Sequence, residues 1–463
     1  VSVALFGFGA SGVVLYIWKK RFAGGNLGYS LGNLSFFAGL TAVAALMIAL
    51  SIQFNPHTPN LQQFIKLLGI YLATSVPFFF AGMILALVFQ RLSGHIARLY
   101  FLSLAGSALG ALLTIPLLQI AGGPGSVLVI TGIAFMAMTA FYLGSEVKDD
   151  KESTPWKKSV VARYAPPLLA ICFVIVGFLN PYIPVVQITY AKGFRTDPDR
   201  LIFDKWNAFS RIIVLRARDN DALGNYQGGI YHWGISEEWS LEENEFPEQL
   251  WLEIDNTAGT PITKFDGDAE TLELAKYDLT AVAHYLLNEP HVLVIGPGGG
   301  KDLLAALAFG ASNVEGAEIN PLIGEAMRNE FADYNGGIYD YGPIHVTVSE
   351  GRTYIARSSE KYDLIQISLI DTWAAASTGA YALSENNLYT IEAFREYFEH
   401  LGPDGIFSMS RFSFDPPRET LKVVSVARAA LEREGVEDAS QCVMVIRQGV
   451  IANVMVSPDG FDE

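Results

Sequence analysis

The stretch HVLVIGPGGGKDLLAALAFGASNVEGAEINP, residues His291–Pro321, determines the fold expected for the C-terminal part of the chain. It reads as a hydrophobic strand, a glycine-rich turn, an apolar helix and a second strand that ends on Glu318. Gly296, Gly298 and Gly300 lie where strand meets helix, so a ligand can approach the backbone and the N–H groups of the helix N-terminus. A carboxylate at the end of the second strand can accept hydrogen bonds from a ribose diol. We therefore expect a nucleoside site, and the alternative is a tight turn that binds no ligand.

The spacing of the glycines limits the kinds of ligand that the turn is expected to bind. The turn reads GxGxG with Lys301 directly after it, whereas the dinucleotide fingerprint is GxGxxG. No basic or hydroxyl-rich segment that could bind a pyrophosphate follows in the sequence. A nucleoside with a short charged tail therefore fits this turn better than a dinucleotide.

Strand and helix patterns alternate from Tyr277 onward. The expected strands are His291–Ile295, Val314–Glu318, His345–Val348, Leu364–Ser368, Ile406–Ser410, Cys442–Arg447 and Ile451–Val456. The expected helices are Asp302–Phe309, Pro321–Phe331, Arg352–Ser358, Ile391–His400 and Arg418–Arg433. This order is typical of an open, mostly parallel α/β sheet of the Rossmann-like type. Only QGV joins the last two strands, so we expect an antiparallel hairpin there, as in seven-stranded methyltransferase-type sheets.

The N-terminal part of the chain has a different character. Of the 463 residues, 51% are hydrophobic, and most of the long apolar runs precede residue 187. Six runs are long enough to cross a bilayer as helices: Val1–Trp18, Leu34–Phe54, Leu61–Phe89, Leu99–Ile120, Ser126–Leu143 and Ala165–Val186. Val1 follows no initiator methionine or leader, so we expect further membrane sequence upstream.

Three parts are therefore expected. Residues 1–187 form a multi-pass helical membrane domain in contact with lipid, and residues 188–276 form a linker and a small β-rich subdomain. The β-rich runs are SRIIVLRAR (210–218) and LWLEIDNTAGTPITKF (250–265). Residues 277–463 form the Rossmann-like domain.

Charge divides the chain at the same place. Residues 1–187 carry a net charge of +7 and residues 188–463 a net charge of −23. An acidic surface repels phosphate backbones, so we expect no nucleic acid partner, while a small amine or a basic protein surface would be favoured. The alternative is an acidic surface that serves only solubility. Cys172 and Cys442 form no expected disulfide, and the seven scattered histidines predict no metal site.

Five motifs resemble the core of spermidine synthases, the polyamine aminopropyltransferases of the class I S-adenosylmethionine fold. They are VLVIGPGGGKDLLAAL, VEGAEINP, SEGRTYI, YDLIQISLIDT and NNLYTIEAFREYFEHLGPDGIFSMS. The β-rich section resembles the N-terminal subdomain of that family. The helical stretch RLYFLSLAGSALGALLTIPLLQIAGGPG resembles multi-pass bacterial proteins in which such a domain is fused to membrane helices. The resemblance implies a transferase that uses S-adenosylmethionine or its decarboxylated form.

The same resemblance implies roles for the ligand-binding residues. Gly296, Gly298 and Gly300 would border the methionine-derived tail, and Glu318 would hold the ribose. Glu350 stands where the family has an acid, usually Asp, that meets the adenine amine. Its alternative is an acid that stabilises a helix N-terminus.

The chain departs from the family at the catalytic positions. Ser368 stands where the usual aspartate base would be, and a neutral hydroxyl is no base near neutral pH without a partner. Gly299 replaces a second aspartate in the glycine turn. Asp371 is retained, and we expect it to transfer a proton or recognise an amine, or else to cap a turn. The following segment TWAAASTGAYALSENNL, with Trp373 and Tyr381, is either a lid over the site or a surface loop.

Three functions remain open on the sequence alone. The first is a membrane-anchored transferase acting on a small acceptor such as an amine. The second is an inactive subunit, a pseudoenzyme that docks protein partners in a membrane complex. The third, a transporter-like domain regulated by a nucleoside, is the weakest because the expected spans lack paired charges.

Loop charges predict the topology. Lys and Arg residues follow the first, third and fifth expected spans, whereas SIQFNPHTPN (51–60) and AGGPGS (121–126) contain no Lys or Arg. The positive-inside rule then places the basic loops in the cytoplasm and residues 188–463 outside it, across a bacterial inner membrane. If Ala165–Val186 were re-entrant instead, the domain would return to the cytoplasm.

Overall fold

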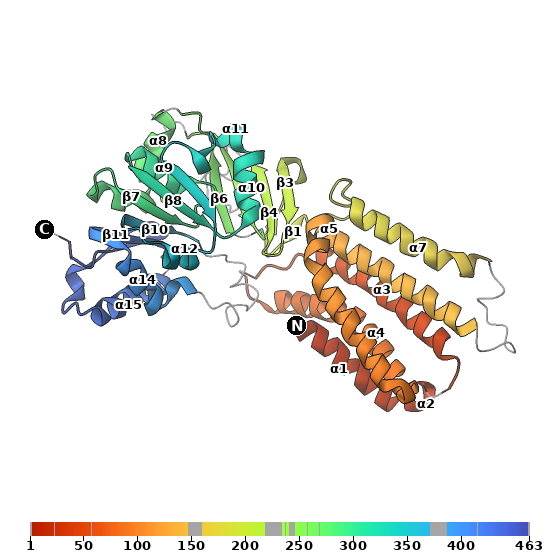
Figure 1. Ribbon diagram of the computed structural model, residues 1–463. Helices are drawn as coiled ribbons and strands as arrows, with labels where there is room; N and C mark the ends of the chain where they lie inside the picture. Colours follow the sequence, from red (N-terminus) through yellow and green to blue (C-terminus); the bar gives the residue numbers. More distant parts are fainter. Residues whose placement is uncertain are drawn as a thin grey trace. The chain divides into compact units, whose positions relative to one another are not determined.

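The structure, a computed structural model, describes residues 2–22, 24–56, 58–146, 160–217, 234–236, 238–239, 246–256, 258–267, 269–370, 387–413 and 415–461. Its contacts divide the chain into two compact units. One comprises Val1–Asp197 with Lys205–Ala208, and the other comprises Pro198–Asp204 with Phe209–Glu463. Figure 1 labels the elements of both units.

The first unit is mainly helical. Its helices are α1 (Ser2–Ile17), α2 (Lys19–Phe22), α3 (Leu27–Ser51), α4 (Leu61–Arg91), η1 (Ser93–His95), α5 (Ile96–Glu146) and α7 (Val160–Leu179), followed by the short strands β1 (Tyr190–Ala191) and β2 (Phe194–Arg195). Leu27–Ser51, Leu61–Arg91 and Ser93–Ser145 are long and apolar enough to cross a membrane, and Ser2–Ile17 and Tyr164–Leu179 are shorter apolar helices. These helices support the expected association with a membrane.

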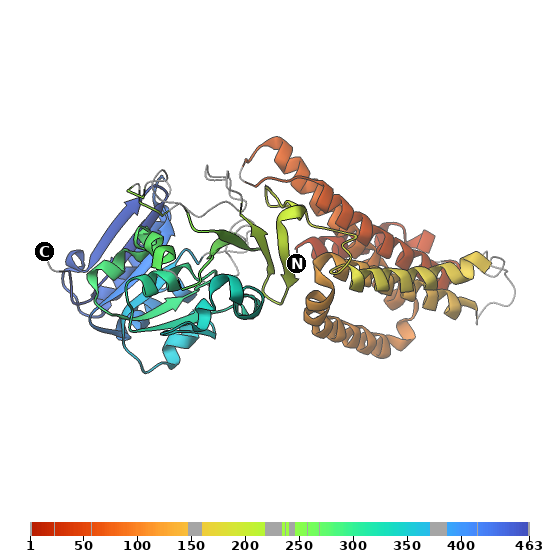
Figure 2. The ribbon, with the colours of Figure 1, turned by 90° about the horizontal axis from the view of Figure 1, so that it is seen from above.

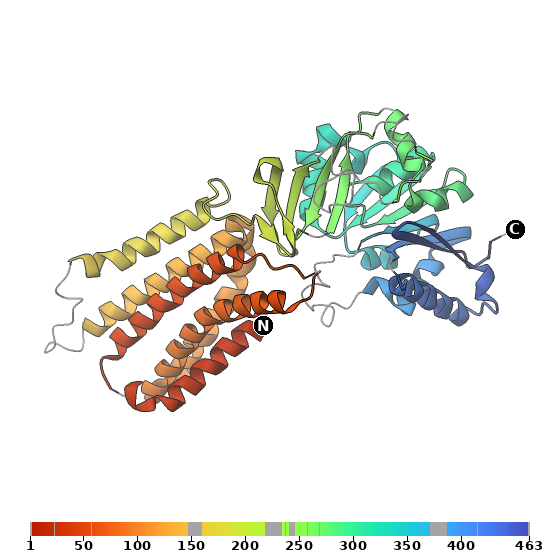
Figure 3. The same ribbon diagram turned by 180° about the vertical axis from the view of Figure 1, so that it is seen from behind.

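Small residues let the helix backbones approach closely. A Cβ atom on Gly7 of α1 would lie 2.5 Å from the carbonyl oxygen of Ser75 in α4. A Cβ atom on Gly125 of α5 would lie 2.4 Å from the carbonyl oxygen of Gly177 in α7. Helices packed in lipid gain stability from such close van der Waals contact. Figure 3 shows α3, α5 and α7 lying alongside one another.

Helix α5 includes two of the expected membrane spans, Leu99–Ile120 and Ser126–Leu143, with no loop between them. The helix is interrupted at Gly122, whose φ of 67° and ψ of 178° are not helical. The indole ring of Trp206 packs on this interruption, because a Cβ atom on Gly123 would lie 2.7 Å from Cη2 of that ring. Glycine is therefore required here both by the backbone conformation and by the close approach of the indole.

The last apolar helix is shorter than its sequence suggests. Helix α7 ends at Leu179, although the apolar run continues to Val186. Beyond it, the side chain of Asn180 accepts hydrogen bonds from the backbone N–H groups of Val185 and Val186, at 3.1 and 2.8 Å. The side chain thus stabilises a turn in which the prolines of this segment can be accommodated.

The second unit begins with a four-stranded sheet, except that Lys205 and Trp206 at the end of its first strand belong to the first unit. Its strands, in spatial order, are β3 (Leu201–Trp206), β4 (Arg211–Arg216), β5 (Gln249–Ile254) and β6 (Ala258–Thr263). β4, β5 and β6 are antiparallel neighbours. This sheet corresponds to the expected β-rich subdomain.

A seven-stranded sheet forms the rest of the second unit. Its spatial order is β12-β13-β11-β10-β7-β8-β9, in which β7 to β11 are parallel to one another and β13 is antiparallel to both β11 and β12. The strands are β7 (His291–Ile295), β8 (Asn313–Glu318), β9 (Ile344–Val348), β10 (Tyr362–Ser368), β11 (Leu401–Phe412), β12 (Val443–Gln448) and β13 (Ile451–Val456). The Rossmann-like sheet and its terminal hairpin are therefore confirmed.

Helices cover both faces of this sheet (Figure 2). Adjacent residues of β10 point to opposite faces, so Leu364 belongs to one hydrophobic cluster and Ile365 to the other. The first cluster includes residues of η3 and α9, and the second includes residues of α14 and α15. The covering elements are α8 (Ala269–Lys276), η3 (Leu279–Leu286), α9 (Lys301–Ala308), α10 (Pro321–Glu325), α11 (Ala332–Asn335), η5 (Ile338–Asp340), α12 (Gly351–Arg357), η7 (Asn387–Tyr389), α14 (Ile391–Glu399), α15 (Arg418–Arg433) and η8 (Ala439–Gln441).

One expected helix is interrupted. The run Pro321–Phe331 is α-helical only to Glu325 and then widens into a π-helical turn, η4, over Ala326–Glu330. The N–H of Phe331 reaches back five residues to the carbonyl oxygen of Ala326, at 2.9 Å. Sequence periodicity does not distinguish such a turn from a regular helix.

Candidate functional site

The carboxyl ends of the parallel strands bring most of the predicted site residues to one edge of the sheet. The glycine turn follows β7, Glu318 ends β8, Glu350 follows β9 and Ser368 ends β10. In open α/β sheets this edge is where ligands bind. Asp371, Trp373 and Tyr381 lie outside the described residues.

The glycine turn is held mainly by its own fold. Gly296, Gly298 and Gly300 have φ values of 75°, 52° and 90°. Their N–H groups donate to the carbonyl oxygen of Ala317 at 2.9 Å, to Glu318 Oε2 at 3.1 Å and to the carbonyl oxygen of Pro297 at 2.8 Å, respectively. These three N–H groups are therefore used within the protein, and the expected approach of a ligand to the backbone and to the N–H groups at the start of α9 stays a prediction.

Strand β6 of the four-stranded sheet packs directly on this turn. A Cβ atom on Gly299 would lie 1.9 Å from the carbonyl oxygen of Pro261 and 3.2 Å from Thr260 Oγ1. Real Cβ atoms essentially never come within 3.0 Å of another heavy atom in this way. The chain thus has no room for the aspartate that the family usually carries at this position.

Glu318 is a buried carboxylate with a fixed orientation. Its side chain is 4% exposed, and its two oxygens accept hydrogen bonds from the N–H of Asn320 at 2.9 Å and the N–H of Gly298 at 3.1 Å. Burial raises the pKa of Glu318, although these two hydrogen bonds act in the opposite direction. A carboxylate has about four acceptor positions, so acceptor capacity remains for a ligand diol.

Tyr339 supports the turn from the protein interior. Its hydroxyl donates to the carbonyl oxygen of Gly298 at 2.6 Å, and its ring is fully buried. Burial, with the charge of Glu318 as a further cause, raises the pKa of Tyr339 well above its ordinary value. Tyr339 therefore stays protonated and fixes Gly298, whose N–H in turn holds Glu318. Sequence reasoning gave Tyr339 no role because it lies in a short 3-10 turn with no motif.

Glu350 caps helix α12. Its Oε1 accepts from the N–H of Arg352 at 3.0 Å, and its Oε2 accepts from both the N–H and the hydroxyl of Thr353 at 2.7 Å. Partial burial opposes ionisation of Glu350, but these hydrogen bonds together outweigh it and lower the pKa. The described contacts thus show the helix-capping role, and the adenine contact stays a prediction.

Ser368 is linked to two residues that the sequence motifs did not single out. Its Oγ accepts a hydrogen bond from Gln366 Nε2 at 3.2 Å. Gln366 Nε2 also donates to the carbonyl oxygen of Thr280 at 3.0 Å, and Gln366 Oε1 lies 3.0 Å from His284 Nε2. A glutamine in the middle of the buried run YDLIQIS was the one available signal, since a buried amide requires partners.

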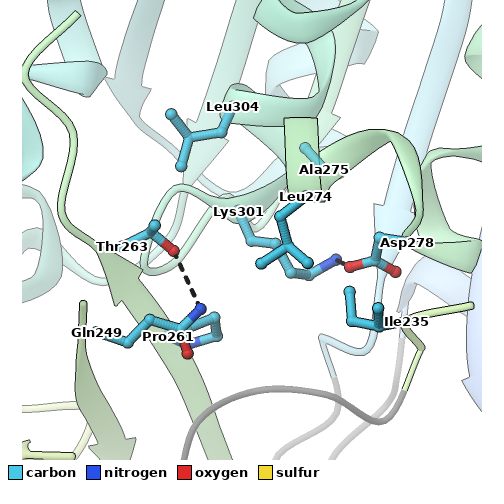
Figure 4. Close-up of a pocket in the computed structure, with 9 residues that line it drawn as sticks. All are labelled: Ile235, Gln249, Pro261, Thr263, Leu274, Ala275, Asp278, Lys301 and Leu304. Atoms are coloured by element: carbon cyan, nitrogen blue, oxygen red, sulfur yellow. Dashed lines mark hydrogen bonds and ion pairs between the residues drawn. The ribbon is translucent and has the colours of Figure 1, made fainter. Parts of the chain in front are cut away.

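Lys301 forms a second polar group behind the glycine turn. Its Nζ lies 3.0 Å from both Asp278 Oδ2 and Asp302 Oδ1, and it also donates to the hydroxyl of Thr280. A cavity of about 30 Å³ opens beside it, with room for water but not for a nucleoside (Figure 4). The cavity is lined by Ile235, Gln249, Pro261, Thr263, Leu274, Ala275, Asp278, Lys301 and Leu304. Within the part of the chain that the structure describes, no three His, Cys, Asp or Glu side chains are grouped to hold a metal ion.

The strand order and this edge of the sheet define a Rossmann-like protein with a seven-stranded methyltransferase-type sheet. No family model matches the chain. Among curated proteins, the polyamine aminopropyltransferase of Korarchaeum cryptofilum is 28% identical over 91 residues, which are 20% of this chain and 28% of that protein. The match therefore spans less than a third of the relative's length. It confirms the resemblance to polyamine aminopropyltransferases that the motifs indicated.

Solved structures of similar proteins were also found. The spermidine synthase from Thermotoga maritima is 18% identical, with 57% of this chain and 74% of that chain covered and a TM-score of 0.36. A probable spermidine synthase from Corynebacterium glutamicum is 12% identical, with 56% and 81% covered and a TM-score of 0.36. The ribosomal protein L11 methylase from Lactobacillus delbrueckii subsp. bulgaricus is 18% identical, with 39% and 76% covered and a TM-score of 0.27.

Proposed function

We propose that residues 277–463 bind S-adenosylmethionine or its decarboxylated form and transfer an aminopropyl or methyl group to a small acceptor, while the N-terminal helices anchor the chain in a membrane. The observation that carries this proposal is Glu318. A buried carboxylate is costly unless it is held by donors, and here two backbone N–H groups hold it at the ligand-binding edge of the sheet. The similarity to a protein named polyamine aminopropyltransferase supports the same chemistry.

The residues present fit such a nucleoside. Glu318 has acceptor positions left for the ribose hydroxyls, and the glycines of the neighbouring turn themselves carry no side chains. Glu350 lies at the end of the neighbouring strand, where it would accept from the adenine amine while it caps α12. The bound sulfonium would supply a carbon that is activated for transfer. The protein's own task is to hold this carbon and the acceptor in line and to exclude water.

The alternative function, an inactive subunit that docks protein partners, gains no support from the comparisons, because the similar curated protein is itself named as an enzyme. Binding to protein partners in a membrane complex stays a proposal. No surface among the described residues supports it.

Calorimetry tests the proposal directly. Full-length protein in detergent should bind methylthioadenosine, S-adenosylmethionine or decarboxylated S-adenosylmethionine. Glu318→Ala should weaken binding by roughly 1.5–3 kcal/mol, because a charged hydrogen-bond acceptor is removed. Glu330→Ala is the matched control, because it removes the same charge from an exposed position and should leave binding unchanged. Absence of heat with all three ligands would contradict the proposed function.

A further inference from the structure

The polar group of Ser368, Gln366 and His284 lies on the face of the sheet that η3 covers. Gln366 and His284 are buried, with 0% and 1% of their surfaces exposed, whereas Ser368 at the end of β10 is partly exposed. The contacts join residues 82 positions apart, from η3 to β10. A buried glutamine on a central strand thus connects a buried histidine to a hydroxyl at the ligand-binding edge.

The hydrogen-bond pattern determines the orientation of the Gln366 amide. Its nitrogen faces two acceptors, the carbonyl oxygen of Thr280 and Ser368 Oγ. If the amide were reversed, its oxygen would face the Thr280 carbonyl oxygen and neither would have a proton to share. Gln366 Oε1 therefore accepts a hydrogen bond from His284 Nε2, so Nε2 carries the proton of the imidazole ring.

His284 is neutral in this arrangement. Burial lowers the pKa of His284 to about 4, although the hydrogen bond to Gln366 and the charge of Asp302 act against this shift. Its Nδ1 is buried and has no hydrogen-bond partner among the described residues, as expected for the unprotonated nitrogen of a neutral ring. The charged groups on the neighbouring elements are Lys301, Asp278 and Asp302, which pair with one another around Thr280.

Ser368 is left with a defined hydrogen-bonding capacity. A hydroxyl has one donor and two acceptor positions, and Gln366 occupies one of the acceptor positions. In the described part of the chain, Ser368 makes no other side-chain hydrogen bond. One O–H donor and one acceptor position therefore remain at the partly exposed edge.

We propose that the group of the acceptor molecule bound at Ser368 is uncharged and both donates and accepts hydrogen bonds, as a hydroxyl or an amide does. Gln366 and His284 position the Ser368 hydroxyl for this group. The inference rests on the proposed function, because it names the acceptor class of the same site. An ammonium group has only donors, so it would leave the Ser368 proton unpaired. Among the described residues, the linked groups that its charge would meet here are a neutral serine, glutamine and histidine.

A matched pair of four-carbon ligands tests this inference. Butane-1,4-diamine and 4-aminobutan-1-ol differ only in whether one end is an ammonium or a hydroxyl group. Titrated into full-length protein saturated with methylthioadenosine, the amino alcohol should bind about three- to tenfold more tightly, since one net hydrogen bond is at stake. Ser368→Asp should reverse the preference, because the carboxylate accepts from and neutralises an ammonium.

Further variants distinguish a positioning role of Gln366 from a general effect of the substitutions on folding. Ser368→Thr keeps the hydroxyl and should retain the preference, whereas Ser368→Ala should abolish it. Gln366→Leu should also abolish the preference while leaving the affinity for methylthioadenosine unchanged, which shows that the variant is folded. The ¹⁵N shifts of His284 should show the Nε2–H form in the wild-type protein, which gives a readout without any substitution.

Each outcome decides one question. If methylthioadenosine binds and the diamine binds as tightly as the amino alcohol, the inference is overturned while the proposed function stands. If methylthioadenosine itself does not bind, the proposed function and the inference fail together. An Nδ1–H form of His284 would overturn the positioning argument whatever the ligand preference.

Discussion

Gly299 offers the sharpest test of how the glycine turn meets strand β6. Gly299→Ala adds a single methyl group, and its Cβ atom would lie 1.9 Å from the carbonyl oxygen of Pro261 and 2.7 Å from the carbonyl carbon. Gly299 is not among the glycines with positive φ, so alanine brings no backbone strain of its own. The whole effect should therefore come from the steric conflict.

The size of the effect follows from these distances. Ordinary contacts of a Cβ atom are 3.4 Å or longer, so the turn and β6 must separate by more than about 1 Å to accept the methyl group. Overpacking of this kind typically costs 1–3 kcal/mol, and the contact with rigid backbone places the expected loss near the upper end, at about 3 kcal/mol. That is a large part of the 5–15 kcal/mol that typically stabilises a domain.

Urea unfolding of the protein in detergent measures the loss, with far-ultraviolet circular dichroism as the signal. Gly402→Ala is the matched control, since its Cβ atom would find its nearest neighbours at 3.5 and 3.8 Å and Gly402 likewise has no positive φ. If the two alanine variants unfold at the same urea concentration, β6 does not pack on the turn as described and the explanation for the missing aspartate is wrong.

Two further predictions concern pH and topology. Burial raises the pKa of Glu253 to about 7 despite the hydrogen bond from Trp251, so the folded protein retains a proton that the unfolded chain loses near pH 4.5. The free energy of unfolding should then fall by about 3 kcal/mol as the pH rises from 4.5 to 7, and Glu253→Gln should flatten this slope in thermal unfolding measured across that range. An unchanged slope in the variant would rule out Glu253 as its source. A phosphatase fused after Glu463 should be active if residues 188–463 lie outside the cytoplasm, whereas fluorescence of a cytoplasmic reporter without phosphatase activity would reverse the topology.

Local sequence patterns were sufficient to locate the seven strands of the large sheet along the chain, although β11 is longer than the predicted Ile406–Ser410. The strands His291–Ile295 and Ile451–Val456 have the predicted bounds, because each is a buried apolar run bounded by turn residues. The predicted connection QGV between the last two strands was too short for anything but an antiparallel hairpin, which is observed with residues 449 and 450 as its loop. The ends of helices were harder to predict, since the apolar run after α7 continues beyond Leu179 while the side chain of Asn180 ends the helix.

The site was predictable only where one motif contained all the interacting groups. Glu318 and Gly298 lie 20 positions apart within the opening stretch, and the structure brings them into contact at 3.1 Å. The packing of Gly299 on Pro261 and the link from Gln366 to His284 instead depend on how separate elements are placed in space. No spacing along the chain reveals such contacts, so both were missed.

The contact between the indole of Trp206 and the interrupted part of α5 can be used experimentally. Because glycine has no side chain, the ring lies directly against the backbone of Gly122 and Gly123. Tryptophan emission depends on the local surroundings of the indole. A variant that retains Trp206 as its sole tryptophan would thus carry an intrinsic optical probe of the interruption in α5, with no added label.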